Sequence, residues 1–459
     1  MSFPKYEAYK DSGVEWLGEV PEHWDVMPLK HLVSTPVTDG PHETPNFIDD
    51  GVLFISAEAV SSGKVDFTKA KYISREDHNR FSKKYKPQKH DIYMVKSGAT
   101  TGVTAIVETE DEFNIWSPLA VIRCNQSHHP YFVLFSMRSR SFQESVVLHW
   151  SFGTQQNIGM SVIENLPITN PPLGEQTQIA RFLDYETARI DALIAEQQRL
   201  IELLKEKRQA VISHAVTKGL DPTAPMKDSG VEWLGEVPAH WEVTPLKHLV
   251  STPITDGPHE TPEFVDDGVL FVSAEAVSSG EVDFTKARYI SREDHNRFSK
   301  KYKPQNHDIF MVKSGATTGV TAIVETDDEF NIWSPLAVIR SNKHHYPYFV
   351  IASMRSLSFQ ESVALHWSFG TQQNIGMRVI ENLPIASPPL EEQIKIAEFI
   401  HGQQDKWNSL ITECKNAVSL LTERRSALIS AAVTGKIDVR GWQAPASVAP
   451  AAPLEAAYG

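Results

Sequence analysis

The chain carries one long sequence twice. Residues 11–18 read DSGVEWLG, residues 228–235 repeat them letter for letter, and adding about 217 to a residue number carries the first copy onto the second without a gap. Over the globular part of the copies, roughly 23 of about 163 positions differ, mostly by mild changes such as Val37 to Ile254. A period of this size indicates two copies of a whole domain rather than a solenoid. A chain of 459 residues is long enough to bury two separate cores.

Beyond Leu173 and Leu390 the copies diverge, and what survives is a heptad pattern. Apolar residues recur at alternating spacings of about four and three, which is typical of a coiled-coil helix. They are Ile179, Leu183, Ile190, Leu193, Leu200, Leu204 and Val211 in the first copy, and Ile396, Ile400, Trp407, Leu410, Leu421 and Leu428 in the second. Polar residues such as Gln197 interrupt the seam.

Each helix needs a partner for its apolar face, and the other copy supplies one. Helix one delivers the chain to domain two, so a paired helix two must run back antiparallel, with the domains expected at opposite ends of a rod of ~60 Å. We therefore expect an α+β fold, in which two similar mixed α/β domains are joined by two long antiparallel coiled-coil helices with an internal pseudo-two-fold.

The expected boundaries follow from the repeat. The parts are domain one (1–172), helix one (173–218), a linker (219–227), domain two (228–389), helix two (390–436) and a largely disordered tail (437–459), which is rich in Ala and Pro from Gly441. Within domain one the pattern predicts short strands over Val52–Ser56, Asp91–Val95, Val103–Val107 and Leu119–Arg123, and a helix over Pro130–Trp150.

The charge of the chain argues against a simple nucleic-acid binder. The formal net charge is −14, whereas phosphate contacts come from Lys and Arg. Between Lys64 and Lys96 the sign reverses, because basic residues outnumber acids: Lys69, Lys71, Arg75, Arg80, Lys83, Lys84, Lys86, Lys89 and Lys96. This stretch is either a basic face or a solvated surface loop, and both interpretations stay open.

The sequence also bears on the compartment. No apolar run approaches the ~18 to 20 residues of a membrane helix, and residues 1–10 lack the apolar core of a signal peptide. The two cysteines, Cys124 and Cys414, correspond to Ser341 and Gln197 in the other copy, so neither belongs to a repeated disulfide or metal site. We therefore expect a cytoplasmic protein.

Three polar loops are candidates for contact with DNA. The loop at residues 153–157 offers Gln and Asn side chains, which can bond bidentately to adenine in the major groove; alternatively it satisfies its own backbone. The loop at residues 96–102 places small residues and hydroxyls after a strand, so its backbone could approach a phosphate beside Lys96; a plain hairpin turn is the equal alternative. The loop at residues 38–45 is the third.

The candidate DNA-contacting residues of the first copy are Thr38, Asp39, Gly40, His42, Thr44, Lys83, Lys84, Lys96, Ser97, Thr100, Thr101, Gly153, Thr154, Gln155, Gln156 and Asn157. Their equivalents in the second copy are Thr255, Asp256, Gly257, His259, Thr261, Lys300, Lys301, Lys313, Ser314, Thr317, Thr318, Gly370, Thr371, Gln372, Gln373 and Asn374.

One motif suggests catalysis and is better explained by structure. Residues 170–173, Asn-Pro-Pro-Leu, resemble the Asn-Pro-Pro-aromatic motif with which amino-methyltransferases hold a flipped base. Here the fourth residue is Leu173 rather than an aromatic, the second copy begins with Ser387, and no glycine-rich cofactor loop accompanies the motif. Two prolines before a helix are interpreted as a rigid start to that helix.

No other catalytic or metal site stands out. Residues 96–102 resemble a phosphate loop, but the lysine precedes the glycines, so ATP binding is not expected. His42 has no second histidine at ligand spacing, and His129 becomes Tyr346 in the other copy, which argues against a metal. No catalytic residues and no cofactor are expected on this chain.

Taken in order, these motifs resemble the specificity subunit of a type I restriction-modification enzyme. The resemblance covers nearly the whole chain and is carried mostly twice. It rests on residues 11–18 with Pro21 and Trp24, residues 39–45, residues 153–156, residues 171–180 (PPLGEQTQIA), and residues 423–429 (ERRSALI) running into residues 434–438 (TGKID).

The resemblance implies a non-catalytic DNA-recognition subunit. Its two target-recognition domains would each grip one half of a bipartite DNA site, separated by helices that also dock two methyltransferase subunits. Those subunits would bring S-adenosylmethionine and methylate adenine. Two restriction/translocase subunits, with ATP and Mg, could join them to cleave unmethylated DNA.

The sequence departs from the family pattern in one respect. Family members commonly carry two unlike recognition domains, whereas here the three candidate loops are identical in both copies. We therefore expect an interrupted palindrome, with half-sites about one helical turn, ~34 Å, apart. Two alternatives remain open from the residues alone: a scaffold that pairs two protein-binding domains without DNA, and a stand-alone DNA methyltransferase.

Overall fold

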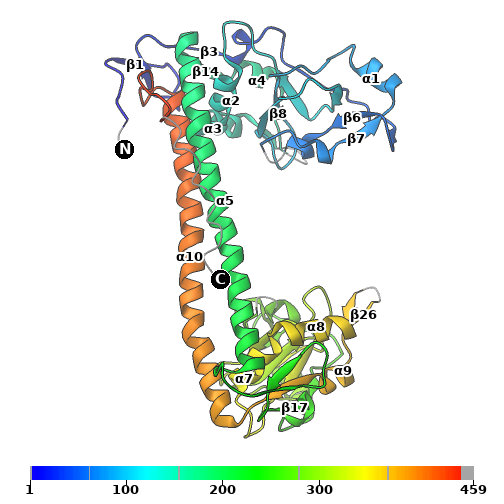
Figure 1. Ribbon diagram of the computed structural model, residues 1–459. Helices are drawn as coiled ribbons and strands as arrows, with labels where there is room; N and C mark the ends of the chain where they lie inside the picture. The colour runs from blue at the N-terminus through cyan, green and yellow to red at the C-terminus, as the bar shows by residue number, and fades with distance from the viewer. Residues whose placement is uncertain (1–2, 61–62, 153–155, 278–279, 370–371, 446–459) are drawn as a thin grey trace. The chain divides into compact units, whose positions relative to one another are not determined.

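The chain divides into two compact units. The computed structural model describes residues 3–60, 63–152, 156–277, 280–369 and 372–445. Unit 1 comprises Met1–Gln197 with Asn416–Gly459, and unit 2 comprises Gln198–Lys415. Each unit therefore contains one globular domain and part of both long helices, α5 (Leu173–Lys218) and α10 (Leu390–Val433) (Figure 1).

Two four-stranded sheets form the centre of the domain in unit 1. The first has the order β4 (Thr38–Asp39), β11 (Leu119–Ile122), β8 (Ile92–Val95) and β9 (Thr104–Ile106), all antiparallel. The second has the order β10 (Phe113–Ile115), β6 (Val52–Ile55), β7 (Lys71–Ile73) and β5 (Phe47–Ile48), with β10 and β6 parallel. Short two-stranded pairs are β1 (Tyr9–Asp11) with β2 (Glu19–Pro21), β3 (Asp25–Pro28) with β14 (Pro167–Asn170), and β12 (Ser151–Phe152) with β13 (Gln156–Asn157).

The central strand β8 supplies two cores because its side chains alternate. Ile92 and Met94 pack with the helices, whereas Tyr93 and Val95 pack between the two sheets. The helices are α1 (Arg75–Phe81), α2 (Pro130–Arg138), α3 (Arg140–His149) and α4 (Met160–Asn165). In Figure 1, α2 and α3 lie between α5 and the strands.

Unit 2 repeats this arrangement. Its sheets have the orders β18 (Thr255–Asp256), β25 (Leu336–Ile339), β22 (Ile309–Val312), β23 (Thr321–Ile323), and β19 (Phe264–Val265), β21 (Arg288–Ile290), β20 (Val269–Val272), β24 (Phe330–Ile332). Its short pairs are β15 (Met226–Asp228) with β16 (Glu236–Pro238), β17 (Glu242–Pro245) with β28 (Pro384–Ser387), and β26 (Ser368–Phe369) with β27 (Gln373–Asn374). Its helices are α6 (Arg292–Phe298), α7 (Pro347–Met354), α8 (Leu357–His366) and α9 (Met377–Asn382).

The four predicted strands of domain one correspond to β6, β8, β9 and β11, but the predicted helix over Pro130–Trp150 is wrong in one respect. It is broken into α2 and α3 at Ser139, whose backbone is extended. The Ser139 hydroxyl accepts a hydrogen bond from Phe142 N and so begins a new helix. The buried Ser139 side chain is thus an N-cap between Arg138 and Arg140, a signal that hydrophobic periodicity does not report.

Within each unit the two long helices pair antiparallel, as predicted. In unit 1 the Asp191 carboxylate lies 2.8 Å from Arg425 Nε, and Gln178 Nε2 donates to Val439 O further along. In unit 2 Arg208 Nη1 donates to Asn408 Oδ1 at 3.4 Å. In unit 2 Ile201 also packs with Ile411. In both units, therefore, residue numbers along α10 and the residues that follow it fall as those on α5 rise.

Ile179, Leu183, Ile190, Ile396, Ile400 and Trp407 of the predicted seam are buried, but in the middle of the helix pair the seam is offset by one residue from the prediction. Leu200 is 40% exposed and Leu410 is 44% exposed, whereas their neighbours Ile201 and Ile411 are both 8% exposed. Leu193, also predicted to lie in the seam, is exposed as well. Because two apolar residues are adjacent at positions 200–201 and 410–411, hydrophobicity alone does not say which one faces the partner.

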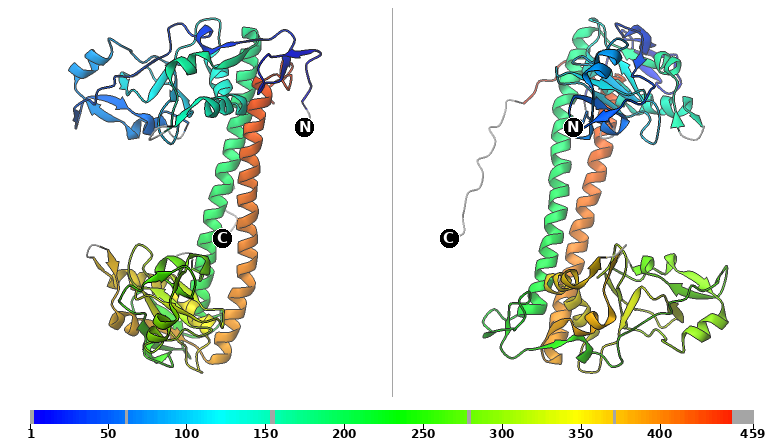
Figure 2. Two further views of the ribbon diagram at one scale, coloured as in Figure 1. Left: turned by 180° about the vertical axis from the view of Figure 1, so that it is seen from behind. Right: turned by 90° about the vertical axis from the view of Figure 1, so that its right-hand side faces the viewer.

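Each domain is fastened to its helix pair by short polar contacts. Arg140 N at the start of α3 donates to Ser430 Oγ of α10, and Leu357 N at the start of α8 donates to Ser213 Oγ of α5, both at 2.8 Å. Figure 2 shows from two further sides that the strands of each unit lie to one side of its helices.

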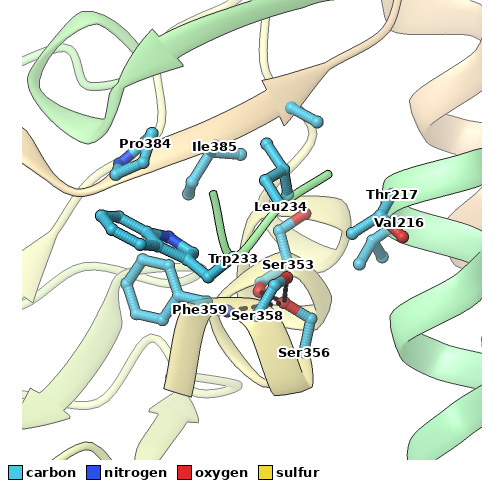
Figure 3. Close-up of a pocket in the computed structure, with 11 residues that line it drawn as sticks. Val216, Thr217, Trp233, Leu234, Ser353, Ser356, Ser358, Phe359, Pro384 and Ile385 are labelled. Carbon is cyan, nitrogen blue, oxygen red and sulfur yellow. Dashed lines mark hydrogen bonds between the residues drawn. The ribbon is translucent and has the colours of Figure 1, made fainter. Parts of the chain in front are cut away.

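A cleft beside this attachment in unit 2 is a packing joint rather than a ligand site. Val216 and Thr217 of α5 line it together with Trp233 and residues of α8 and β28 (Figure 3). The Trp233 ring lies over Phe359 and below Pro384 in the figure. The free space is about 10 Å³, which leaves room for at most one water molecule.

The first described residues, 3–4, contact residues 437–445 in unit 1. Asp438 N donates to Pro4 O at 2.8 Å, and the rings of Phe3 and Trp442 each lie 5.3 Å from Phe182. The expectation that the tail is largely disordered from residue 437 is therefore wrong for residues 437–445, where Val439 is 1% exposed. Trp442 and Val439 pack against an apolar surface of α5. The Ala- and Pro-rich composition around them does not indicate this packing. Residues 446–459 lie outside the described residues.

Candidate nucleic-acid interface

The first candidate loop begins at β4 and is fixed by close backbone packing. Thr38 and Asp39 pair with Val121 and Ala120 of β11. Gly40 lies so close to β10 that a Cβ there would be 2.2 Å from Ile115 O, so only glycine fits. Beyond Gly40 the chain turns outward, and His42 and Thr44 are exposed.

Asp39 forms the centre of an ion cluster. Its Oδ1 lies 2.5 Å from Lys84 Nζ, and its Oδ2 lies 2.8 Å from Lys96 Nζ. His42 Nε2 lies 3.2 Å from the same Oδ2. The Asp39 side chain is 9% exposed and that of Lys96 is 14% exposed. The cluster therefore holds one carboxylate and two ammonium groups, of which the carboxylate and Lys96 are largely out of water, whereas the Lys84 side chain is 43% exposed.

The second copy builds the same cluster with the same geometry. Asp256 Oδ1 lies 2.6 Å from Lys301 Nζ, Asp256 Oδ2 lies 2.9 Å from Lys313 Nζ, and His259 Nε2 is 3.3 Å away. Burial alone would raise the pKa of each aspartate, but hydrogen bonds from the two lysines outweigh it and hold the pKa below the ordinary value of 3.8. Both carboxyls are therefore ionised at neutral pH.

Loops two and three are joined through their backbones. Gly98 N donates to Gln156 O at 2.9 Å, Ile158 N donates to Lys96 O at 2.9 Å, and Ser97 bridges to Asn157. Gly98 and Gly102 have φ of 103° and 96°, which favours glycine in this turn. Gln143 of α3 holds the turn by donating to Gly102 O.

The structure thus brings the three loops together. Asp39 connects the first loop to Lys96 in the second, and the second pairs with the third; Thr100 and Thr101 complete the turn between β8 and β9. In unit 2 the corresponding loops meet through Gly315, Gln373, Ser314 and Asn374, with Thr317 and Thr318 in the turn, and Gln372 Nε2 donates to Ser314 Oγ. Thr255, Gly257 and Thr261 occupy the places of Thr38, Gly40 and Thr44.

The third loop is described only in part. Gly153, Thr154, Gln155, Gly370 and Thr371, all predicted to contact DNA, lie outside the described residues. Gln156 and Gln373 are half-buried, whereas Asn157, Gln372 and Asn374 are exposed. DNA contact by any residue of the three loops stays a prediction.

A buried network beside the basic segment was not foreseen from the sequence. Asp91 accepts hydrogen bonds from Arg123 Nε, from the Tyr85 hydroxyl and from Gln88 N, and Arg123 Nη2 also donates to Lys86 O. This network anchors residues 83–89, which carry four lysines: Lys83, Lys84, Lys86 and Lys89. The sequence signal is an acid before β8 and a base after β11, which become neighbours because Ile92 pairs with Ile122.

The motif at residues 170–173 has the structural role predicted for it. Asn170 ends β14, and α5 begins at Leu173. Gln176 Nε2 donates to Asn170 Oδ1 and to Pro171 O, so the amide and the prolines fix the start of the helix.

In the described part of the chain no group of three or more His, Cys, Asp or Glu side chains could hold a metal ion. Among the same residues, no helix is long and apolar enough to cross a membrane.

Comparison with known proteins agrees with this geometry. The family model described as the type I restriction modification DNA specificity domain matches residues 47–203 and again residues 265–419. Among curated relatives, the MjaX specificity subunit of Methanocaldococcus jannaschii is 26% identical, covering 96% of this chain and 99% of the relative. The EcoKI specificity subunit of Escherichia coli (strain K12) is 22% identical, covering 93% and 92%.

Solved structures show the same fold. A chain from a study of complex assembly and conformational transition of the type I R-M system has a TM-score of 0.68 at 16% identity, covering 90% of this chain and 98% of its own length. The HsdS subunit from Thermoanaerobacter tengcongensis has a TM-score of 0.50 at 16% identity, covering 91% and 98%.

These findings define the class of protein. Because the family model matches more than half of the chain, in one stretch of each repeat, the chain belongs to the family of type I restriction-modification DNA specificity subunits. Members of this family recognise DNA and are not themselves enzymes, and the two domains of this chain are its recognition domains.

Proposed function

We propose that both recognition domains read the same half-site on opposite strands, so that the target is an interrupted palindrome. One observation carries this proposal: all three candidate loops have the same sequence in both copies, and the Asp39 and Asp256 clusters at their centre agree to within 0.1 Å in each lysine contact. Because the same side chains lie in the same positions in both domains, the two domains present the same hydrogen-bond donors and acceptors to base edges.

The partners follow from the same proposal. Two methyltransferase subunits, each with S-adenosylmethionine, would assemble on the helices and methylate an adenine in each half-site. Two restriction/translocase subunits with ATP and Mg would complete a nuclease where the host encodes them. This chain binds no cofactor of its own in the proposal, and its compartment is the cytoplasm, where the DNA lies.

The test is the methylation pattern of the host genome. In cells that carry this system, single-molecule sequencing is expected to find methylated adenines in an interrupted palindrome, on both strands, and to find none there when the gene for this chain is deleted. An asymmetric bipartite motif that disappears with the gene would overturn the proposal of equal half-sites while leaving DNA recognition in place.

A further inference from the structure

Two adjacent lysines at the interface differ in their ion pairing. Both follow α1, in the segment that the Asp91 network anchors. Lys84 Nζ is held 2.5 Å from Asp39 Oδ1 and 2.8 Å from Gly40 O. Both side chains are exposed, that of Lys84 at 43%, but the described part of the chain gives Lys83 no ion pair. The second copy shows the same difference: Lys301 binds Asp256 and Gly257 O, whereas Lys300 has no ion pair among the described residues, and both lysines are exposed.

The difference matters because unpaired cationic side chains determine how strongly a protein binds DNA non-specifically, whatever the DNA sequence. Each phosphate that a lysine neutralises releases counterions, which makes binding stronger and more dependent on salt. An ammonium group that is already bound to a carboxylate must exchange that partner before it can neutralise a phosphate. Asp39 is only 6% exposed and the Lys96 side chain 14%, so salt screens this pair weakly, and it screens the pair with the more exposed Lys84 more strongly.

Lys96 is bound even more firmly than Lys84. Its side chain is 14% exposed, and its backbone oxygen accepts from Ile158 N in the third loop. A lysine in this position cannot extend to a distant phosphate, and without Asp39 it would be an unpaired, largely buried charge. Asp39 therefore decides where the charge of two lysines is available.

We propose that Asp39 and Asp256 are specificity-determining positioning residues, each of which binds two lysines in an internal ion cluster and so withholds their charge from DNA of the wrong sequence. The inference rests on the proposed function, since it concerns the same face. The clustered ammonium groups keep a net charge of one and lie where the three loops meet, so they act only on duplex DNA that is seated against those loops.

The first test removes the carboxylates. Asp39→Asn with Asp256→Asn, in the full chain with its methyltransferase subunits, is expected to bind random-sequence duplex more tightly. The log–log salt slope should become steeper by up to ~0.9 for each freed lysine that meets a phosphate. Binding to the methylated motif should improve less, so discrimination should fall.

The matched control for the first test is Asp66→Asn with Asp283→Asn. These aspartates cap short turns outside the three loops, where each accepts from a threonine and lies near a lysine. The change in net charge is the same, and Asn can still cap the turn. If the control steepens the salt slope as much as the double Asp39 and Asp256 change does, net charge alone explains the effect and the inference fails.

The second test keeps both carboxylates paired with Lys96 and Lys313 and stands even if the first variant does not assemble. Lys83→Gln with Lys300→Gln is expected to flatten the salt slope on random duplex, by up to ~0.9 for each phosphate that is no longer neutralised. Lys84→Gln with Lys301→Gln, one residue further along, is expected to leave that slope unchanged. Equal flattening by both pairs would overturn the inference.

The two proposals fail in different ways. If the wild-type complex shows no preference for the methylated motif over random duplex, the proposed function fails, whatever the lysine variants do. If that preference is present and the two lysine pairs behave alike, only the role of Asp39 and Asp256 is refuted.

Discussion

The two copies differ by one hydroxyl inside a buried network. The Tyr93 hydroxyl lies 3.1 Å from that of Tyr85, whereas unit 2 has Phe310 at the position of Tyr93 and keeps Tyr302 bonded to Asp308. The pairs Arg123 with Asp91 and Arg340 with Asp308 are present in both. The repeat thus shows which member of the network can be replaced.

Asp91→Asn and Tyr93→Phe should therefore have very different effects on stability. Asp91 is 1% exposed, and its replacement leaves the Arg123 guanidinium without its charged partner, at a cost of about 3 kcal/mol. Tyr93→Phe removes one neutral hydrogen bond and should cost about 1 kcal/mol. Thermal melts of the full chain measure both, with Asp308→Asn as the parallel change in unit 2. Similar destabilisation by Asp91→Asn and Tyr93→Phe would contradict this account.

At the scale of elements, the sequence is informative where a pattern repeats and uninformative where a contact crosses the chain. Short buried strands, the start of α5 and the antiparallel pairing within each unit follow from periodicity and chain order. The break at Ser139 does not, because one N-cap decides it. The contact between residues 437–445 and the first described residues does not follow from periodicity either, because it depends on the tertiary packing of Trp442 and Val439.

The candidate site is predictable to a similar degree. The three loops are found from residue type, but their convergence depends on strand register and on the Asp39 cluster. Lys96 is predicted as a phosphate contact from its place before the glycines, whereas the structure gives its ammonium to Asp39. The spacing of charged residues along a chain does not show which opposite charge a fold will bring to them.

The offset seam of the helices gives an element-scale prediction. Leu200→Gln should change stability by less than ~0.5 kcal/mol, because this side chain faces solvent in the structure. Ile201→Gln should cost about 2 kcal/mol or more, because it places an amide in the cluster of Ile201, Ile411 and Cys414. Urea unfolding followed by helical circular dichroism compares the two, and Leu410→Gln with Ile411→Gln repeats the comparison on α10. A larger destabilisation at Leu200 than at Ile201 would restore the seam predicted from the sequence.

At the scale of the whole molecule, the duplication separates the three loops, which are identical in both copies, from the positions where the copies differ. Substitutions between the copies, such as Lys64 to Glu281, Lys89 to Asn306, Arg140 to Leu357 and Ser161 to Arg378, fall outside the three loops. Lys89 pairs with Glu110 at 3.8 Å and Arg140 with Glu144 at 2.7 Å, so these charges have partners of their own. Such changes are expected to alter phosphate contact or stability and to leave base choice unaffected.

This separation can be tested by making the copies identical. A chain in which residues 228–389 are replaced by the sequence of residues 11–172 keeps both long helices and gives both domains every residue of the first copy. If the loops alone choose bases, the genome should be methylated at the same motif as with the natural chain. A chain with Gln156→Ala and Gln373→Ala is the control that should change or abolish methylation. A new motif from the chain with identical domains would show that residues outside the loops read bases, and the four charge substitutions would then be reverted one at a time to find them.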